Sequence, residues 1–169
     1  MAGLTPPRPL TREDDRQAFD CGRESLNQWL RRHAWDNQEA SVSRTSVVCD
    51  SLTGAVAGYI ALSAAQIERG ALPRSAQRNR PDPLPAVLLG QLATHRAFQG
   101  RGLARSLVYF ALTTAVRLAQ DIGCYGVLTH PLDEGLREFY GKFGFETLPF
   151  DPRRSMIVRI IDLRRNGFG

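Results

Sequence analysis

The stretch Gln99-Gly100-Arg101-Gly102-Leu103-Ala104 is the most informative part of the sequence. It lies between a strand-like apolar run over residues 86–94 and a long amphipathic pattern that begins at about Gly102. A glycine turn between a strand and a helix presents unpaired backbone N–H groups and the positive end of the helix dipole to an anion. The glycines also let the main chain approach a phosphate closely. The stretch therefore predicts a pyrophosphate-binding loop.

Two common phosphate loops do not fit this stretch. A P-loop requires Lys followed by Ser or Thr after its second glycine, and Leu103-Ala104 stands there instead. A dinucleotide-binding fingerprint requires a further glycine or alanine and an acid at the end of the next strand. Asp121 precedes the next strand-like run and does not end it. The loop therefore belongs to neither class.

The order Gln/Arg-x-x-Gly-x-Gly/Ala over residues 99–104 resembles the acyl-CoA pyrophosphate loop of the GNAT superfamily of N-acetyltransferases. The preceding residues 89–94 are similar to that family's central strand, whose splayed backbone pairs with the pantetheine arm of the cofactor. Downstream, the run Phe139-Tyr140-Gly141-Lys142-Phe143-Gly144-Phe145 is similar to the family's Phe-Tyr-x-x-x-Gly-Phe motif. These segments cover roughly the C-terminal half of the chain.

Length and composition describe one globular domain over residues 1–169. The chain is 43% hydrophobic and 23% charged, and no apolar run reaches the ~18 residues of a membrane helix. Without the apolar segment of a signal peptide, the protein is expected to be cytoplasmic. Three widely spaced cysteines and three scattered histidines predict neither a disulfide framework nor a metal site. The net charge of +5 fits either simple solubility or an anionic macromolecular partner.

Hydrophobic periodicity gives the order of the elements. We expect helices from Arg12 (capped by Thr11), over residues 23–39, over 102–120 and from Asp133 to Lys142, and strands over 45–50, 55–66, 86–94, 126–129 and 155–162. A proline- and arginine-rich loop over residues 68–85 carries one turn of helix near residues 75–79. This order predicts an α/β fold. The resemblance implies a single GNAT-like domain, whose mixed, mostly antiparallel central sheet is flanked by helices and has a V-shaped splay at its central strands.

Acetyl transfer from a thioester to an amine needs a neutral amine, a donor for the oxyanion and a proton for the departing thiolate. A backbone N–H near Ala93 or Thr94 can serve the oxyanion. Tyr140 is the candidate proton donor, because a phenol of pKa near ~10 is protonated at pH 7. Phe139 and Tyr140 lie ~100° apart around a helix, so we assign Phe139 to the core and Tyr140 to the cofactor. The alternative is that both belong to an ordinary apolar helix face.

The resemblance also implies which residues bind acetyl-CoA, the expected co-substrate. They are Leu92, Ala93 and Thr94 of the central strand, Gln99, Gly100, Arg101, Gly102, Leu103, Ala104 and Arg105 of the loop and helix start, and Thr129 and Tyr140 further on. The matching tyrosine is the usual acid in the family.

A general base is harder to find. Many relatives place a glutamate on the central strand, whereas this chain has Gln91 and no acid between Ala86 and Thr94. Such a site suits an acceptor amine of low pKa, such as an α-amino group near ~7.7–8.0, better than a lysine near ~10.4. The α-amine of an aminoacyl-tRNA, next to an ester carbonyl, should be more acidic still. His95 and His130 remain candidate bases.

A narrower resemblance covers the N-terminal half. Phe19-Asp20-Cys21-Gly22, followed by Leu26-Asn27-x-Trp29-Leu30 and Ala34, resembles the start of the acetyltransferase toxins of bacterial type II toxin–antitoxin pairs. Those enzymes acetylate the amino group of charged tRNAs and block translation. The resemblance implies aminoacyl-tRNA as substrate and a ribbon-helix-helix antitoxin as partner, although an arginine is more usual at Gln91. An acetyltransferase for small-molecule or peptide amines, and a non-catalytic CoA- or partner-binding module, remain alternatives.

Basic residues outside the phosphate loop are the candidates for tRNA binding. They are Arg31 and Arg32 of the N-terminal helix, Arg74, Arg78 and Arg80 of the proline-rich loop, and Lys142. A homodimer is left open.

Overall fold

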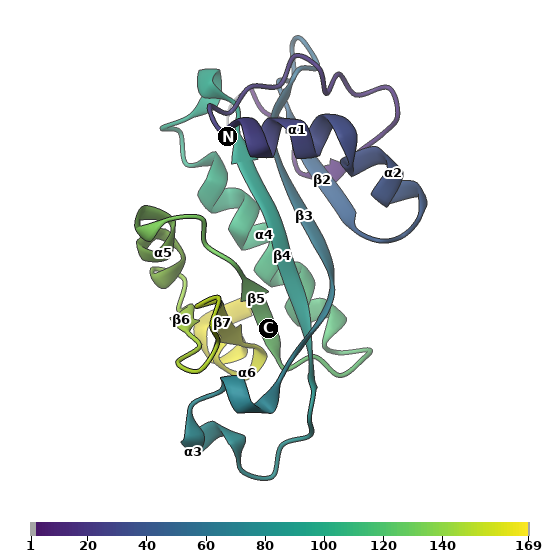
Figure 1. Ribbon diagram of the computed structural model, residues 1–169. Helices are drawn as coiled ribbons and strands as arrows, with labels where there is room; N and C mark the ends of the chain where they lie inside the picture. Colours follow the sequence, from purple (N-terminus) through teal and green to yellow (C-terminus); the bar gives the residue numbers. More distant parts are fainter. Residues whose placement is uncertain (1–2, 169) are drawn as a thin grey trace. The chain divides into compact units, whose positions relative to one another are not determined.

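The computed structural model describes residues 3–168 as a mixed α/β fold (Figure 1). Its helices are α1 (Glu24–Arg32), α2 (Ala34–Glu39), α3 (Arg74–Gln77), α4 (Leu103–Leu118), α5 (Glu134–Gly141) and α6 (Ile160–Leu163). Its strands are β1 (Arg8–Pro9), β2 (Arg44–Cys49), β3 (Val56–Ile67), β4 (Leu84–Thr94), β5 (Gly126–Thr129), β6 (Glu146–Thr147) and β7 (Met156–Arg159). Short 3-10 turns cover Arg69–Ala71 and Arg96–Phe98. No helix within residues 3–168 is both long enough and apolar enough to cross a membrane.

The strands hydrogen-bond in the order β1-β2-β3-β4-β5-β7-β6. Strands β4 and β5 run parallel, whereas the pairs β1–β2, β2–β3, β5–β7 and β6–β7 are antiparallel. The prediction of a mixed, mostly antiparallel sheet is thus confirmed. Pairing of β4 with β5 ends at Leu89 and Thr129, and β4 continues to Thr94 without β5. Strand β5 itself ends at Thr129, so the last pair coincides with the end of β5.

The chain divides into two compact units, and β3, β4 and α4 each contribute to both. The first unit holds the chain up to Ser63 together with Gly90–Ala111, and the second holds Ala64–Leu89 and the chain from Leu112 onward.

In the first unit, α1 packs against the sheet around Tyr59. The Tyr59 hydroxyl donates to the Leu26 carbonyl at 2.7 Å, and its ring stacks on Trp29 with centroids 5.9 Å apart. The start of α4 also lies close to β3, because a Cβ at Gly58 would stand 3.0 Å from the Leu103 side chain. Glycine at this position lets the helix that follows the phosphate loop approach the sheet. The buried core contains Leu10, Phe19, Leu26, Leu30, Ala34, Val47, Cys49, Val56, Tyr59 and Ala93.

In the second unit, β5 lies between β4 and β7. Its residues are fully buried, in keeping with the continuous apolar run Gly126–Thr129. Asp133 caps α5 by accepting a hydrogen bond from the Leu136 N–H at 2.8 Å, as the sequence predicted for the start of this helix. The buried core contains Ile67, Leu72, Leu84, Ala86, Leu128, Leu148 and Ile157.

Several predicted elements differ from the structure. No helix forms from Arg12, because the Asp14 carboxylate accepts hydrogen bonds from the Thr11 N–H and hydroxyl at 2.8 and 3.1 Å and from Arg8, which closes a turn instead. The helix expected over residues 23–39 is interrupted at His33. The strand expected over residues 155–162 ends at Arg159, where α6 begins. The short strands β1 and β6 carry no periodicity that a sequence pattern can detect.

Candidate acetyl-CoA and acceptor sites

The predicted phosphate loop has the backbone of an anion cradle. Gly100 and Gly102 both adopt φ +79°, which side chains rarely allow, and no heavy atom lies within 4 Å of a Cβ placed on either. The first hydrogen bond of the following helix runs from the Ser106 N–H to the Gly102 carbonyl at 3.1 Å. The N–H groups of Leu103–Arg105 precede it and have no acceptor inside the helix. An open, left-handed glycine turn thus leads into the positive end of α4.

The loop is fastened to the rest of the first unit by Gln99 and Arg96. The Gln99 side-chain amide donates to the carbonyls of Cys21 and Thr94, both at 3.0 Å. Arg96 pairs with the Asp20 carboxylate at 3.1 Å, and its N–H donates to the Asp20 carbonyl at 2.9 Å. The Gln99 side chain therefore holds the loop in place, and its backbone N–H donates to the Arg96 carbonyl at 3.5 Å.

Asn27 closes the turn that supports the loop. It is only 2% exposed, and its Oδ1 accepts a hydrogen bond from the Cys21 N–H at 2.9 Å. Its Nδ2 donates to the Asp20 carboxylate at 3.0 Å and to Glu24 at 3.3 Å. The N-terminal motif that carries the toxin resemblance therefore has a structural role, because Asn27 holds the turn at Cys21 to which Gln99 of the phosphate loop is bonded.

We expect Asn27→Ala to lower the free energy of unfolding by about 1–3 kcal/mol, because the half-buried Cys21 N–H loses its acceptor. Urea denaturation measures this change. Gln28→Ala on the same helix is the matched control, since Gln28 makes an exposed bond to Glu24, and it should cost no more than about 0.5 kcal/mol. Equal losses in the two variants would contradict the structural role given to Asn27.

The end of β4 carries the residues predicted to meet the pantetheine arm. Ala93 is buried in the core of the first unit, while Leu92 and Thr94 are half-buried. The Thr94 hydroxyl is buried and has no hydrogen-bond partner in the described part of the chain. A buried hydroxyl without a partner is costly, so a polar ligand group beside it would be stabilising.

Tyr140 is a buried phenol in the second unit. It is 4% exposed on α5, and burial raises its pKa to about 12, with a hydrogen bond to the Thr129 side chain as a smaller opposing influence. Thr129 is itself buried, and its hydroxyl donates to the Leu89 carbonyl at 3.1 Å. The phenol therefore keeps its proton throughout the neutral pH range and can donate it.

The assignment of Phe139 to the core is corrected by the structure. Tyr140 is the more buried of the two aromatics, and Phe139 is half-buried. The reason is that the chain turns back after α5, with the Phe145 N–H bonded to the Tyr140 carbonyl at 3.4 Å. The rings of Phe139 and Phe145 then stand edge-on to Tyr140 with centroids 5.3 and 5.4 Å away.

Arg31 does not fit the predicted tRNA-binding set. Its guanidinium donates to the Phe19 carbonyl at 2.8 Å and pairs with Glu24 at 3.3 Å, and its side chain is 23% exposed. These bonds hold α1 to the Phe19 turn. Arg32, next to it, is exposed.

The remaining predicted tRNA residues lie at the surface of the second unit. Arg74, Arg78 and Arg80 are all exposed on the segment around α3, and Lys142 is exposed after α5. The guanidinium of Arg74 lies 5.8 Å from the Phe150 ring centroid. Arg80 is placed in the same way over Tyr125, also at 5.8 Å. Basic groups held on aromatic rings remain open to a phosphate.

The two candidate bases have different surroundings. His95 caps the 3-10 turn before the phosphate loop, because its Nδ1 accepts a hydrogen bond from the Ala97 N–H at 3.0 Å. Its ring also packs edge-on against Phe19. His130 follows β5 directly, and its Nδ1 lies 2.6 Å from the Ser155 hydroxyl.

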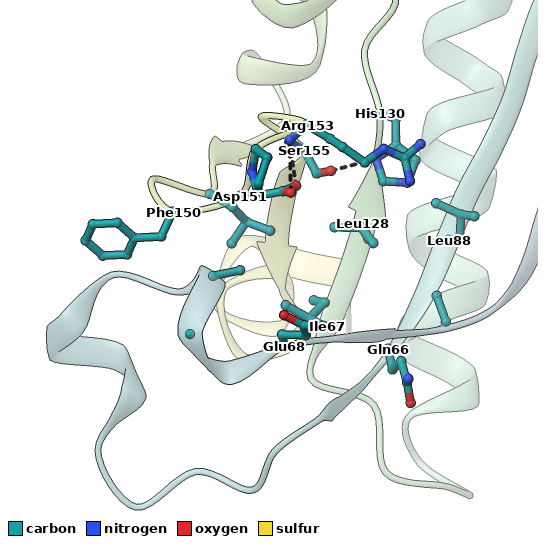
Figure 2. A pocket seen from close by; sticks show the side chains of 15 residues that line it. Gln66, Ile67, Glu68, Leu88, Leu128, His130, Phe150, Asp151, Arg153 and Ser155 are labelled. Carbon is teal, nitrogen blue, oxygen red and sulfur yellow. Dashed lines mark hydrogen bonds between the residues drawn. The ribbon is translucent and has the colours of Figure 1, made fainter.

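His130 borders a cavity of about 520 Å³ that the sequence did not indicate (Figure 2). The cavity is formed within the second unit by the ends of β3 and β5 and by the segment between β6 and β7. Its polar residues come from three separate parts of the sequence, at Glu68, at His130 and over residues 151–155, so no single motif indicated the cavity. Residues 3–168 contain no group of three or more His, Cys, Asp or Glu side chains arranged to hold a metal ion.

Comparison with known proteins agrees with the fold. The model of the acetyltransferase (GNAT) family matches residues 9–145. A tRNA-acetylating toxin of Mycobacterium tuberculosis is 37% identical over 158 residues, which cover 94% of this chain and 94% of that protein. The solved structure of AtaT complexed with acetyl-methionyl-tRNAfMet is 30% identical with a TM-score of 0.89, covering 96% of this chain and 98% of AtaT. A mutant AtaT toxin bound to the C-terminus of the antitoxin AtaR and acetyl-CoA is 26% identical, with a TM-score of 0.81 and coverage of 97% and 98%.

Proposed function

The chain belongs to the acetyltransferase (GNAT) family, and from this premise we propose that it transfers the acetyl group of acetyl-CoA to the α-amino group of an aminoacyl-tRNA. Residues 1–169 act as one acetyltransferase domain, and the reaction blocks translation because an acetylated amine cannot accept a peptide. The open glycine turn at Gly100–Gly102 before α4 is the main structural support for acetyl-CoA as the co-substrate. Similarity to a tRNA-acetylating toxin supports the choice of acceptor.

Acetyl-CoA fits the residues of the first unit. We assign the pyrophosphate to the backbone amides of Gly100–Arg105, where positive φ angles and the start of α4 favour an anion. The pantetheine arm would add to the edge of β4 over Leu92–Thr94, as a strand does, and the Thr94 hydroxyl offers it a polar group. A mutant AtaT toxin has been solved with acetyl-CoA, which supports this co-substrate.

The proposed reaction has two chemical steps. The neutral amine attacks the thioester carbonyl, and a backbone N–H near Ala93 or Thr94 stabilises the oxyanion. The C–S bond then breaks, and the Tyr140 phenol gives its proton to the thiolate. Tyr140 suits this role because burial keeps the phenol protonated at neutral pH. Thr129, which bonds both Tyr140 and the Leu89 carbonyl, positions it.

We also propose a protein partner. AtaT is bound to the C-terminus of its antitoxin AtaR, so a cognate antitoxin is expected here, carrying a ribbon-helix-helix domain of its own. The protein acts in the cytoplasm, where charged tRNA is found, and a homodimer is compatible with this proposal.

The exposed residues Arg32, Arg74, Arg78, Arg80 and Lys142 form the proposed tRNA surface. Arg31 is excluded because its guanidinium is bonded to Phe19 and Glu24. The three arginines around α3 are the strongest part of the set, since they share one exposed segment.

Arg78→Glu combined with Arg80→Glu should reduce acetylation of charged tRNA about 10-fold or more at physiological salt, because phosphate contacts dominate nucleic-acid affinity. The slope of log affinity against log salt should flatten by about 0.7–0.9 for each arginine–phosphate pair that the substitutions remove. Binding titrations across a salt series measure the slope, and calorimetry should show unchanged acetyl-CoA affinity. Arg164→Glu with Arg165→Glu changes the net charge equally on another exposed segment and serves as the control. An equal loss in the control would remove the α3 segment from the proposed surface.

The proposed function is tested in a reconstituted translation system. The protein should inhibit protein synthesis only when acetyl-CoA is supplied, and fresh charged tRNA should restore synthesis after the protein is removed. If free amines or peptides are acetylated while charged tRNA is not, the protein is an acetyltransferase for those acceptors instead.

A further inference from the structure

The cavity beside His130 combines apolar walls with a polar rim (Figure 2). Its walls are formed by Ile67, Leu88, Leu128 and Leu148. The titratable and charged groups that face it are Glu68 at the end of β3, His130 after β5, and Asp151 and Arg153 before β7. A pocket of this size with apolar walls and a few converging polar groups is typical of a small-ligand site.

Three polar residues on this rim form a hydrogen-bonded chain. The Ser155 hydroxyl, which is buried, lies 2.6 Å from His130 Nδ1. Ser155 also bonds Asp151, through its N–H at 3.0 Å and through its side chain. Burial alone would raise the pKa of Asp151, but the hydrogen bonds from Ser155 and from the Arg153 N–H bring it below its usual range. Asp151 is therefore an ionised carboxylate at neutral pH.

The hydrogen bonds of Ser155 favour one tautomer of His130. An ionised carboxylate can only accept, so the Ser155 hydroxyl donates its one proton to Asp151. The Ser155 oxygen then accepts from the Nδ1–H of His130. Nε2 is left with its lone pair, and the ring makes no other hydrogen bond within residues 3–168. This is the tautomer that a histidine needs in order to take a proton at Nε2.

The charges around the ring keep it neutral. Burial lowers the pKa of His130, the nearby Arg153 guanidinium lowers it further, and Asp151 opposes both. In Figure 2 the Arg153 side chain extends toward His130. A neutral imidazole at pH 7 is able to act as a base.

The position of His130 along the chain connects it with the proposed chemistry. Thr129 and Leu89 form the last pair between β5 and β4, and His130 is the next residue. The part of β4 beyond Leu89 is the segment to which we assign the acyl-bearing arm of acetyl-CoA. Leu88, Leu128 and His130 line the cavity, so it lies at the end of the paired segment of β4 and β5.

We propose that this cavity receives the aminoacyl end of the acceptor tRNA, with its amino-acid side chain against the apolar walls, and that His130 Nε2 takes the proton from the reacting amine. The inference rests on the proposed function. As the N–C bond to the acetyl group forms, one N–H bond breaks and its proton moves to Nε2. The C–S bond breaks and the thiolate takes the proton of Tyr140. His130 is a catalytic residue in this account, and Ser155 and Asp151 are positioning residues.

The first test is His130→Asn. The asparagine amide can still bond Ser155 at the place of Nδ1, but it has no basic nitrogen at the place of Nε2. The rate with charged tRNA at saturation should fall about 100-fold, the lower end of what a general base contributes. Affinity for acetyl-CoA should not change. His33→Asn, at an exposed histidine of the first unit, should retain full activity. Full activity in His130→Asn would overturn the proposal.

The second test uses the pH dependence of the rate at saturating tRNA. The reaction needs neutral His130, so the rate should fall as the pH drops through the pKa of this residue. Asp151→Asn removes a charge that raises this pKa, so the acid limb should move to lower pH. Arg153→Gln removes a charge that lowers it, so the limb should move to higher pH. Shifts in the same direction, or no acid limb in the unmodified protein, would contradict the role of His130.

Nuclear magnetic resonance of protein labelled with ¹⁵N in its three histidines reports the tautomer directly. We expect the Nδ1–H form at His130. The Nε2–H form would contradict the proposed role of His130 as the base. The outcomes separate the two proposals. If the unmodified protein does not acetylate charged tRNA, the proposed function fails and this inference falls with it. If it does and the His130 variant is equally fast, only the inference fails.

Discussion

Tyr140→Phe should lower the rate of acetyl transfer by about 10²–10⁴-fold while acetyl-CoA affinity stays within about twofold, because a general acid contributes on this scale. The substitution removes one oxygen and leaves the ring between Phe139 and Phe145. It deletes the proton that the departing thiolate would take. Single-turnover kinetics with charged tRNA measure the effect.

The matched control for this prediction is Tyr109→Phe, which removes the same oxygen from an exposed tyrosine on α4. Its rate should be unchanged. Thermal unfolding checks that both variants remain folded. If Tyr140→Phe turns over at the full rate, Tyr140 is only a core aromatic and the proton comes from another group.

Gly102→Val should weaken acetyl-CoA binding about 100-fold or more. At φ +79° a β-branched residue is strained by roughly 1–3 kcal/mol, and its side chain would occupy the open space that the phosphate needs. Either the loop changes conformation or the valine side chain fills the space for the phosphate. In both cases the pyrophosphate loses hydrogen bonds from the backbone N–H groups of the loop. Isothermal titration calorimetry with acetyl-CoA measures the loss.

Gly54→Val separates backbone strain from loss of the cradle. Gly54 adopts φ +76° in the turn between β2 and β3, with no heavy atom within 4 Å of a Cβ placed there. The two variants should lose similar stability, but only Gly102→Val should lose acetyl-CoA affinity. Unchanged affinity in Gly102→Val would remove the loop from the proposed site.

The sequence predicted those elements whose signal is local. The apolar run Gly126–Thr129 and the capping residue Asp133 located β5 and α5, because burial on both faces and a side-chain cap leave direct marks in the sequence. The glycine turn before α4 could be predicted for the same reason, since glycine adopts positive φ angles more readily than other residues. Thr11 and the acids after it gave an equally local signal, but Asp14 satisfied the backbone of a turn instead.

The parts of the site that escaped prediction depend on contacts between distant segments. Nothing in the sequence near Gln99 shows that its side chain bonds the carbonyl of Cys21, and nothing near Arg31 shows that it bonds Phe19. The same holds for the cavity, where His130 and Ser155 come together only because β5 and β7 are neighbours in the sheet. The residue types of Gln99 and Arg31 suggested contact with a ligand. In the folded chain both side chains instead make hydrogen bonds to backbone carbonyls.

The most direct test of the central claim is the chemical identity of the acetylated product. Charged tRNA is incubated with the protein and isotopically labelled acetyl-CoA, digested with a nuclease, and analysed by mass spectrometry for the 3′-terminal nucleoside and its amino acid. We predict labelled N-acetyl-aminoacyl-adenosine, formed from charged tRNA, absent with uncharged tRNA, and formed about 10²–10⁴-fold more slowly by the Tyr140→Phe variant. Labelled product from free amines or peptides, with the aminoacyl-adenosine left unacetylated, would contradict the proposed function.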